Sequence, residues 1–356
     1  MPSLVIGDLV AQIPIVQGGM SVGISLACLA AAVANEGAIG VIGTAGIGME
    51  EEDWEKEFEE SNIRALRKEI RKARQMTKGI IGVNIMVALT NFQDMVRVSI
   101  EEGIDIIFSG AGLPLSLPKI AGEKCRTKLA PIVSSGRAAG VICKAWHQRY
   151  KRIPDAVVVE GPLAGGHLGF TMEQLEEIDD YKLEKLVKDV MEALKPWEDT
   201  YKKKIPVIAA GGIYTGKDIV KFLRMGAAGV QMGTRFVATE ECDASPAFKE
   251  YFVRAKKEDL MVIKSPVGMP GRAIKNDFLV KVHSGEKVPF SCSYHCLVTC
   301  NPRKSIYCIA KALINAKRGE FDYGFAFAGE NAYRIERIMT VKELISDLVK
   351  EAEADA

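Results

Sequence analysis

His167 is the side chain with the clearest chemical potential, because it lies in the glycine-rich stretch EGPLAGGHLG at residues 160–169. An imidazole can exchange a proton near neutral pH or hydrogen-bond a substrate oxygen. Glycines present no side chain, so this loop can lie close to a planar ligand. We predict that His167 is catalytic and that Glu160, Gly165 and Gly166 help to bind the ligand. The alternative is a loop histidine bonded to backbone.

Two more glycine-containing stretches, AGGI at residues 210–213 and MGTR at residues 232–235, each follow an apolar run. Where side chains are missing, backbone N–H groups can approach phosphate oxygens, and a following helix adds a favourable dipole. Gly211, Gly212, Gly233 and Thr234 are therefore predicted to bind a phosphate group. Tight turns would also account for these glycines.

Two other stretches, QGGM at residues 17–20 and GVNIM at residues 82–86, also follow or end apolar runs. Their backbone amides and one side-chain amide could face the ring of a planar ligand, although a turn could equally require these residues. The residues added to the predicted ligand site are Gln17, Gly18, Gly19, Met20 and Asn84.

These candidate residues must be positioned by strands, and the chain has eight short apolar runs of suitable length. Their near-continuous hydrophobicity is typical of strands buried on both faces. Val83, Phe108, Val133 and Val158 recur at intervals of 25 residues, which fits one strand, one helix and two short loops. The eight predicted strands are residues 14–17, 39–42, 80–84, 104–108, 130–133, 156–159, 206–209 and 229–232.

Alternating strands and helices predict an α/β fold with a parallel sheet, either closed or open. Eight units within about 235 residues match a closed (β/α)8 TIM barrel. An open, doubly wound sheet would prefer a Gly-x-Gly-x-x-Gly turn after its first strand, and QGGM lacks that spacing. We therefore expect a ligand-binding barrel at residues 1–240 and a carboxyl-terminal extension, or cap, at residues 241–356 that packs on the barrel mouth. Residues 325–334 are expected to line the pocket.

The stretches at residues 14–20, 82–86, 164–169, 209–213 and 231–236 resemble, in this order, those of one superfamily. It comprises nitronate monooxygenases (2-nitropropane dioxygenases) and FabK-type enoyl-ACP reductases. The resemblance spans roughly residues 10 to 240. It implies bound FMN, with the phosphate at Gly211, Gly212, Gly233 and Thr234, and His167 as the active-site histidine.

The resemblance leaves two reactions open. Nitronate monooxygenases use the flavin to oxidise alkyl nitronates with O2, whereas the reductases pass hydride from NAD(P)H through FMN to a carbon–carbon double bond. Leu163 and Ala164 depart from the acidic residue that commonly precedes Gly-Gly-His in both groups. We expect a nitronate monooxygenase-type oxidoreductase, with an NAD(P)H-dependent enoyl-thioester reductase as the alternative. Two other classes of protein are alternatives. A flavin-free barrel enzyme that acts on a sugar phosphate would be colourless, and a protein that only senses flavin would bind it without turnover.

Four of the eight cysteines, namely Cys292, Cys296, Cys300 and Cys308, lie within seventeen positions. Their spacing does not match a zinc ribbon. Four thiolates could hold another metal or an iron–sulfur cluster that relays electrons to FMN. Ordinary thiols and, in a reducing compartment less favourably, a disulfide are the alternatives.

Composition limits the partners of this chain of 356 residues, which has a formal net charge of +1. It has no basic run interleaved with aromatic residues, so we expect no nucleic-acid partner. Apolar runs stay shorter than the roughly 18 residues that span a bilayer, and the start lacks the pattern of a signal peptide. We expect a cytoplasmic enzyme with a small-molecule substrate, and carry a homodimer forward as a hypothesis.

Overall fold

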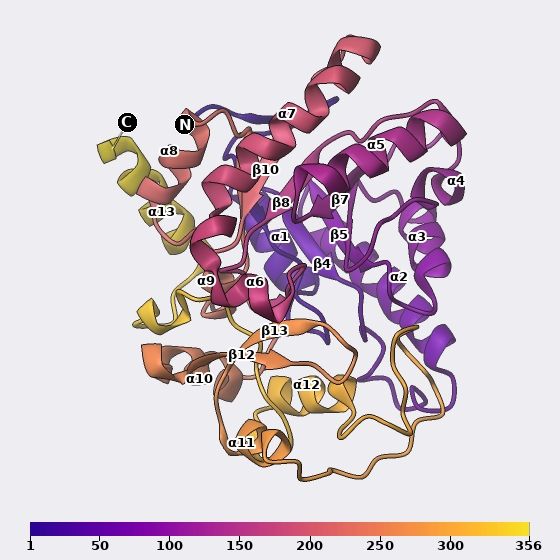
Figure 1. Ribbon diagram of the computed structural model, residues 1–356, viewed down its shortest axis with the longest axis vertical. Coiled ribbons are helices and arrows are strands. Elements are labelled where there is room, and N and C mark those ends of the chain that lie inside the picture. The colour runs from indigo at the N-terminus through magenta and orange to yellow at the C-terminus, as the bar shows by residue number, and fades with distance from the viewer. Residues whose placement is uncertain (356) are drawn as a thin grey trace.

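The computed structural model of the protein, which describes residues 1–355, contains an eight-stranded parallel barrel (Figure 1). The strands follow the order β3-β11-β10-β8-β7-β6-β5-β4, and a parallel bridge between Val16 and Ile39 joins the two ends. All eight predicted strands are confirmed. They are β3 (Ile15–Gln17), β4 (Gly40–Gly43), β5 (Ile81–Met86), β6 (Ile106–Gly110), β7 (Lys128–Val133), β8 (Val157–Glu160), β10 (Val207–Ala210) and β11 (Gly229–Met232).

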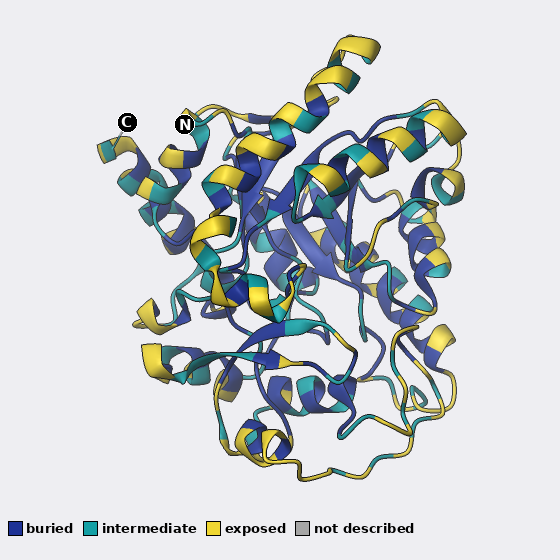
Figure 2. Ribbon diagram, in the orientation of Figure 1, coloured by how far each residue is buried: buried dark blue, intermediate teal, exposed yellow. Residues whose placement is uncertain are grey.

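The barrel interior is filled by apolar side chains that point inward from the strands, such as Ile39, Phe108 and Val158. Figure 2 shows this central region as almost wholly buried. A short antiparallel hairpin, β1 (Leu4–Ile6) with β2 (Leu9–Ala11), adds its apolar residues to the same cluster. It covers the amino-terminal end of the barrel, so the carboxyl ends of the strands are the expected place for a ligand.

Helices surround the barrel, and the last of them comes from the end of the chain. α13 (Val341–Asp355) packs against α8 and α1. The backbone N–H of Gly216 donates to Glu351 Oε2 at 2.7 Å. The extension predicted at residues 241–356 therefore does not pack wholly on the barrel mouth. The apolar face of α13 is buried on the barrel wall instead. The other outer helices are α1 (Ala27–Asn35), α2 (Phe58–Met76), α3 (Phe92–Glu101), α4 (Leu117–Ala121), α5 (Gly136–Tyr150), α7 (Leu183–Tyr201) and α8 (Gly216–Arg224).

The segment between β11 and α13 forms the cap at the carboxyl end of the strands (Figure 1). Strand β13 (Pro270–Ile274) pairs both with β12 (Leu260–Lys264) and with β9 (Gly166–His167), which lies in the loop after β8. This pairing joins the cap to the loop after β8, which carries His167. The cap elements are α9 (Thr234–Val237), α10 (Pro246–Arg254), β12 (Leu260–Lys264), β13 (Pro270–Ile274), α11 (Asp277–His283) and α12 (Ile309–Arg318), with β9 at Gly166–His167 and α6 at Met172–Glu176.

Between α11 and α12, residues 284–308 form neither a helix nor a strand, apart from one bridge between Leu297 and Leu89. All four clustered cysteines lie in this segment or at its end. None of the helices within residues 1–355 is long and apolar enough to cross a membrane.

Candidate active site

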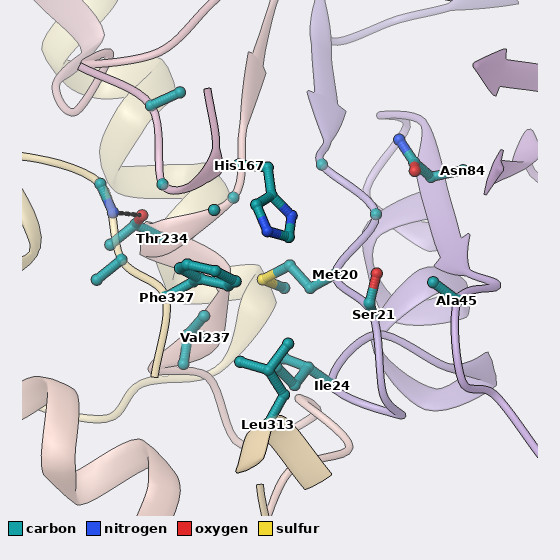
Figure 3. Close-up of a pocket in the computed structure, with 18 of the residues that line it drawn as sticks. Met20, Ser21, Ile24, Ala45, Asn84, His167, Thr234, Val237, Leu313 and Phe327 are labelled. Carbon is teal, nitrogen blue, oxygen red and sulfur yellow. Dashed lines mark hydrogen bonds between the residues drawn. The ribbon is translucent and has the colours of Figure 1, made fainter. Parts of the chain in front are cut away.

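A cavity of about 310 Å³ lies between the carboxyl ends of the strands and the cap (Figure 3). The structure brings together at this cavity every residue predicted for the ligand site except Gln17. These residues are Gly18, Gly19, Met20, Asn84, Glu160, Gly165, Gly166, His167, Gly211, Gly212, Gly233 and Thr234.

Gln17 does not line the cavity. Its side chain is fully buried, its Oε1 accepts from the N–H of Val41 at 2.9 Å, and its Nε2 donates to the carbonyl of Gly18. The amide therefore satisfies backbone groups between the first and second barrel strands. Its predicted role in ligand binding is not supported, because both polar ends of the side chain are already used within the barrel.

His167 lies in the middle of the cavity. Backbone pairing of its strand β9 with β13 places the residue opposite Gly271. Its Nε2 is 2.9 Å from Ser265 Oγ, and its ring meets the Phe327 ring edge-on at 5.0 Å. Figure 3 shows the imidazole pointing into the space between Phe327 and Met20. Burial lowers the pKa of His167 to about 4, so the ring is neutral at physiological pH, donating from one nitrogen and accepting at the other.

Glu160 ends strand β8 at the floor of the cavity. Burial raises the pKa of its carboxyl group to about 7. Among residues 1–355, no other side chain or backbone group pairs with this carboxyl group. Near neutral pH the group is thus protonated in part, and it can donate a hydrogen bond to an acceptor atom of a ligand.

The backbone around strands β10 and β11 fits a phosphate group. Gly211 and Gly212 have φ values of +93° and +84°, which side-chain-bearing residues rarely adopt. A Cβ added at Gly233 would meet no atom within 4 Å, so the backbone there is bare toward the cavity. Thr234 Oγ1 accepts from the N–H of Gly329 at 3.0 Å, which leaves the hydroxyl proton free to donate. These donors suit an anion such as the FMN phosphate.

The loop after the first barrel strand meets the third barrel strand, β5, where Gly19 lies against Asn84. A Cβ at Gly19 would lie only 2.4 Å from Asn84 Cβ, so a glycine is needed for this approach. The carbonyl of Asn84 accepts from the N–H and the hydroxyl of Thr44 at 3.1 and 2.8 Å. These bonds fix the backbone of Asn84, and its side chain lies against the backbone of the first loop at the cavity.

The expectation that residues 325–334 line the pocket is confirmed for Phe325 to Asn331. Asn331 Nδ2 donates to the carbonyl of Gly212 at 2.7 Å, and the N–H of Glu330 donates to the carbonyl of Leu163 at 3.1 Å. Glu330 also forms an ion pair with the buried Arg272. The sequence indicates this segment only by its composition and position, and no motif in it predicts the individual contacts.

Away from the glycine loops, the cavity is apolar. Figure 3 shows Ile24, Val237 and Leu313 together on the side of His167 away from its backbone. This apolar chamber is lined by Val22, Ile24, Met49, Phe58, Leu89, Val237, Phe248, Phe252, Leu297, Ile309, Leu313 and Phe325. His167 thus lies between a polar, glycine-lined end and an apolar end.

All eight cysteines are free thiols, so no disulfide joins the clustered four. Within residues 1–355, no group of three or more His, Cys, Asp or Glu side chains could hold a metal ion. The expectation of a metal bound directly by Cys292, Cys296, Cys300 and Cys308 therefore receives no support. Of these four, Cys296 lines the cavity.

A barrel mouth with glycine-rich loops, an embedded neutral histidine and an apolar chamber is the arrangement of a TIM-barrel oxidoreductase. Residues 3–351 match the family model described as nitronate monooxygenase, and the chain belongs to this family.

Two similar proteins carry names for different activities. A probable nitronate monooxygenase of Staphylococcus saprophyticus is 25% identical over 380 residues, covering 98% of this chain and 97% of that protein. A Mycobacterium tuberculosis protein, (3aS,4S,5R,7aS)-5-hydroxy-7a-methyl-1-oxo-octahydro-1H-indene-4-carboxyl-CoA dehydrogenase, is 28% identical over 274 residues, covering 77% of this chain and 66% of that protein.

Among solved structures, FabK from Thermotoga maritima is similar with a TM-score of 0.75 and 31% identity, over 96% of this chain and 93% of that chain. A nitroalkane oxidase from Streptomyces ansochromogenes shares the fold with a TM-score of 0.74 and 21% identity, over 96% of each chain.

Proposed function

We propose that the protein is an FMN-dependent oxidoreductase of the nitronate monooxygenase type, which oxidises an alkyl nitronate or a related small substrate. The observation that carries this proposal is the neutral His167, placed between glycine-rich loops and an apolar chamber. A flavin on the glycine loops would leave the chamber for the carbon chain of the substrate. The expected cytoplasmic location and the homodimer stay predictions.

The residues of the chain would divide the work as follows. Gly211, Gly212, Gly233 and Thr234 would hold the phosphate, and FMN, when bound, supplies the redox chemistry. His167 would donate a hydrogen bond to an oxygen of the nitronate group. Its neutral state suits this role, because one ring nitrogen carries a proton to donate and burial disfavours the imidazolium. The apolar walls exclude water from the reacting atoms.

An enoyl-thioester reductase that uses NAD(P)H is the second candidate. The many apolar side chains that line the chamber favour it, since an acyl chain would bury more apolar surface there than a short nitronate. The similarity to FabK from Thermotoga maritima supports the same choice. In this case His167 would hydrogen-bond the thioester carbonyl oxygen.

The test begins with the absorbance spectrum of the anaerobically purified full chain. NADH, NADPH and a nitronate such as propyl-2-nitronate are then added separately. Bleaching of flavin bands by the nitronate alone supports the first proposal, and bleaching by a nicotinamide supports the reductase. No flavin absorbance, even after reconstitution with FMN, would overturn both.

His167→Ala tests the residue that carries the proposal. We expect turnover to fall by about 100-fold or more, the usual worth of a positioned acid–base group, with the FMN content unchanged. His283→Ala is the matched control, because His283 lies on α11 and its Nδ1 bonds only to the carbonyl of Leu279, at 2.9 Å. Equal turnover of H167A and the unaltered protein would remove His167 from the mechanism.

A further inference from the structure

The imidazole of His167 is held by a serine that lies outside the cavity lining. Ser265 Oγ is 2.9 Å from His167 Nε2, and Ser265 itself is buried and does not line the cavity. Among residues 1–355, His167 Nδ1 has no hydrogen-bond partner. Nδ1 is therefore the ring nitrogen that is available to a ligand.

One small sheet positions both groups. His167 lies on β9 opposite Gly271 of β13, and Ser265 directly follows β12, which pairs with the same strand. Two backbone hydrogen bonds close the turn between β12 and β13. The N–H of Ser265 donates to the carbonyl of Met269, and the N–H of Gly268 donates to the carbonyl of Ser265, both at 3.0 Å. The serine hydroxyl is thus presented to the imidazole by a turn of fixed geometry.

The ring of Phe327 limits rotation of the imidazole. It meets the His167 ring edge-on at 5.0 Å, and an antiparallel bridge between Ala273 and Phe327 attaches it to the same sheet. Gly271 makes room for this ring, because a Cβ there would lie only 2.7 Å from Phe327 Cε1. The orientation that places Nε2 at Ser265 is therefore fixed by packing as well as by the hydrogen bond.

The hydrogen bonds of Ser265 indicate which atom carries the imidazole proton. A hydroxyl has one proton to donate, and Ser265 Oγ already accepts from the N–H of Val267 at 3.4 Å. Among residues 1–355, His167 Nε2 is the sole acceptor within reach of that hydroxyl proton. A proton on Nε2 would leave the hydroxyl proton buried without an acceptor, which is unfavourable. Because the neutral ring carries one proton, that proton resides on Nδ1.

We propose that Ser265 is a positioning residue, which donates its hydroxyl proton to His167 Nε2 and thereby fixes the imidazole as the tautomer protonated on Nδ1. The second partner of a histidine decides in this way which nitrogen serves the ligand. His167 Nδ1 would then donate to an oxygen of the nitronate or, in a reductase, to the thioester carbonyl oxygen. This role toward the substrate rests on the proposed function, whereas the tautomer is a property of the folded chain.

The test is a nitrogen NMR spectrum of the full chain, prepared with isotopically labelled histidine and measured with and without added FMN. At about pH 7 the His167 ring is neutral, and couplings between ring protons and ring nitrogens distinguish its two tautomers. The chain has four histidines, so comparison with H167A identifies the signals of His167. We expect the proton on Nδ1. A proton on Nε2 in the unaltered protein would overturn the proposal.

Ser265→Ala removes the donor to Nε2 and keeps the backbone hydrogen bonds of the turn. We expect the His167 proton to move to Nε2 in all or part of the molecules. The value of kcat/KM should fall by about tenfold, the equivalent of one hydrogen bond between neutral groups, with the FMN content unchanged. Ser265→Thr keeps a hydroxyl and should restore both the tautomer and most of the turnover. An S265A protein that keeps its proton on Nδ1 would refute the role of Ser265, even if turnover falls.

Ser134→Ala is the matched control. Ser134 Oγ donates to the carbonyl of Gly169 at 2.9 Å, so it holds the same loop without contacting the imidazole. S134A should keep the His167 proton on Nδ1, and the same change of tautomer in S134A and S265A would contradict the proposal. If Nδ1 carries the proton but neither a nitronate nor a nicotinamide bleaches the flavin, the proposed function fails while the tautomer assignment stands.

Discussion

Replacing Glu160 by Gln tests the physical state of the carboxyl group on the cavity floor. Burial raises its pKa from the ordinary 4.5 to about 7, whereas the unfolded chain carries a glutamate with the ordinary value. Between these values the folded protein binds more protons than the unfolded chain, so the free energy of unfolding falls as pH rises through this window. At 1.36 kcal/mol per pH unit, the full loss is about 3 kcal/mol.

Gln has nearly the same shape and no proton to lose, so E160Q should escape this loss. We expect the stability of E160Q relative to the unaltered protein to rise by about 2.5 kcal/mol between about pH 5 and about pH 8. The assay is urea unfolding of flavin-free protein, followed by circular dichroism at both pH values. Glu192→Gln, on the exposed face of α7, is the control and should show no such difference. Parallel pH profiles for E160Q and the unaltered protein would refute the reasoning.

Three further substitutions test the remaining parts of the site. Gly233→Val would fill space that no atom occupies, so FMN affinity should fall by about 100-fold or more while the stability of the flavin-free protein stays within about 1 kcal/mol. Flavin titration measures the affinity, and an unchanged affinity would contradict a phosphate at this position. Glu330→Gln leaves the buried Arg272 without its anionic partner, so the free energy of unfolding should fall by about 2 kcal/mol after discounting for the partial exposure of Glu330. Urea unfolding measures this change, and an unchanged free energy of unfolding would show that the ion pair contributes little. Leu313→Trp would narrow the apolar chamber, so kcat/KM for long-chain substrates should fall by about tenfold with short nitronates little affected; an equal loss for both would place the chain elsewhere.

The barrel and most of the site could be predicted from the sequence because their signals are local. Each strand is a short apolar run that ends in its own glycines or polar residue, so the order of the runs already assigns the loops after β8, β10 and β11 to the mouth. A (β/α)8 barrel brings the ends of all strands to one edge. The site residues on those loops therefore meet without any further information.

Contacts between distant segments could not be predicted in this way. Ser265 meets His167 from 98 residues away, and nothing in the spacing of either segment indicates the contact. Gln17 lies outside the cavity lining for a different reason: one residue decides whether a side chain ends the strand or begins the loop, and side chains on a strand alternate in direction. The return of α13 to the barrel wall depends on the path of the whole cap, which amphipathic periodicity alone does not specify.

The cap is attached to the barrel at both of its ends, since it leaves after β11 and returns to α13. The cap is therefore an insertion between two barrel elements and not a carboxyl-terminal domain. Deleting the chain from residue 241 onward would remove α13 as well as the cap. The apolar surface of α8 and α1 that Leu344 and Leu348 cover would then be exposed to solvent. A cap exchanged between relatives should instead be excised internally and rejoined at α13. Such chimaeras could transfer substrate preference while the wall that keeps the barrel closed remains intact.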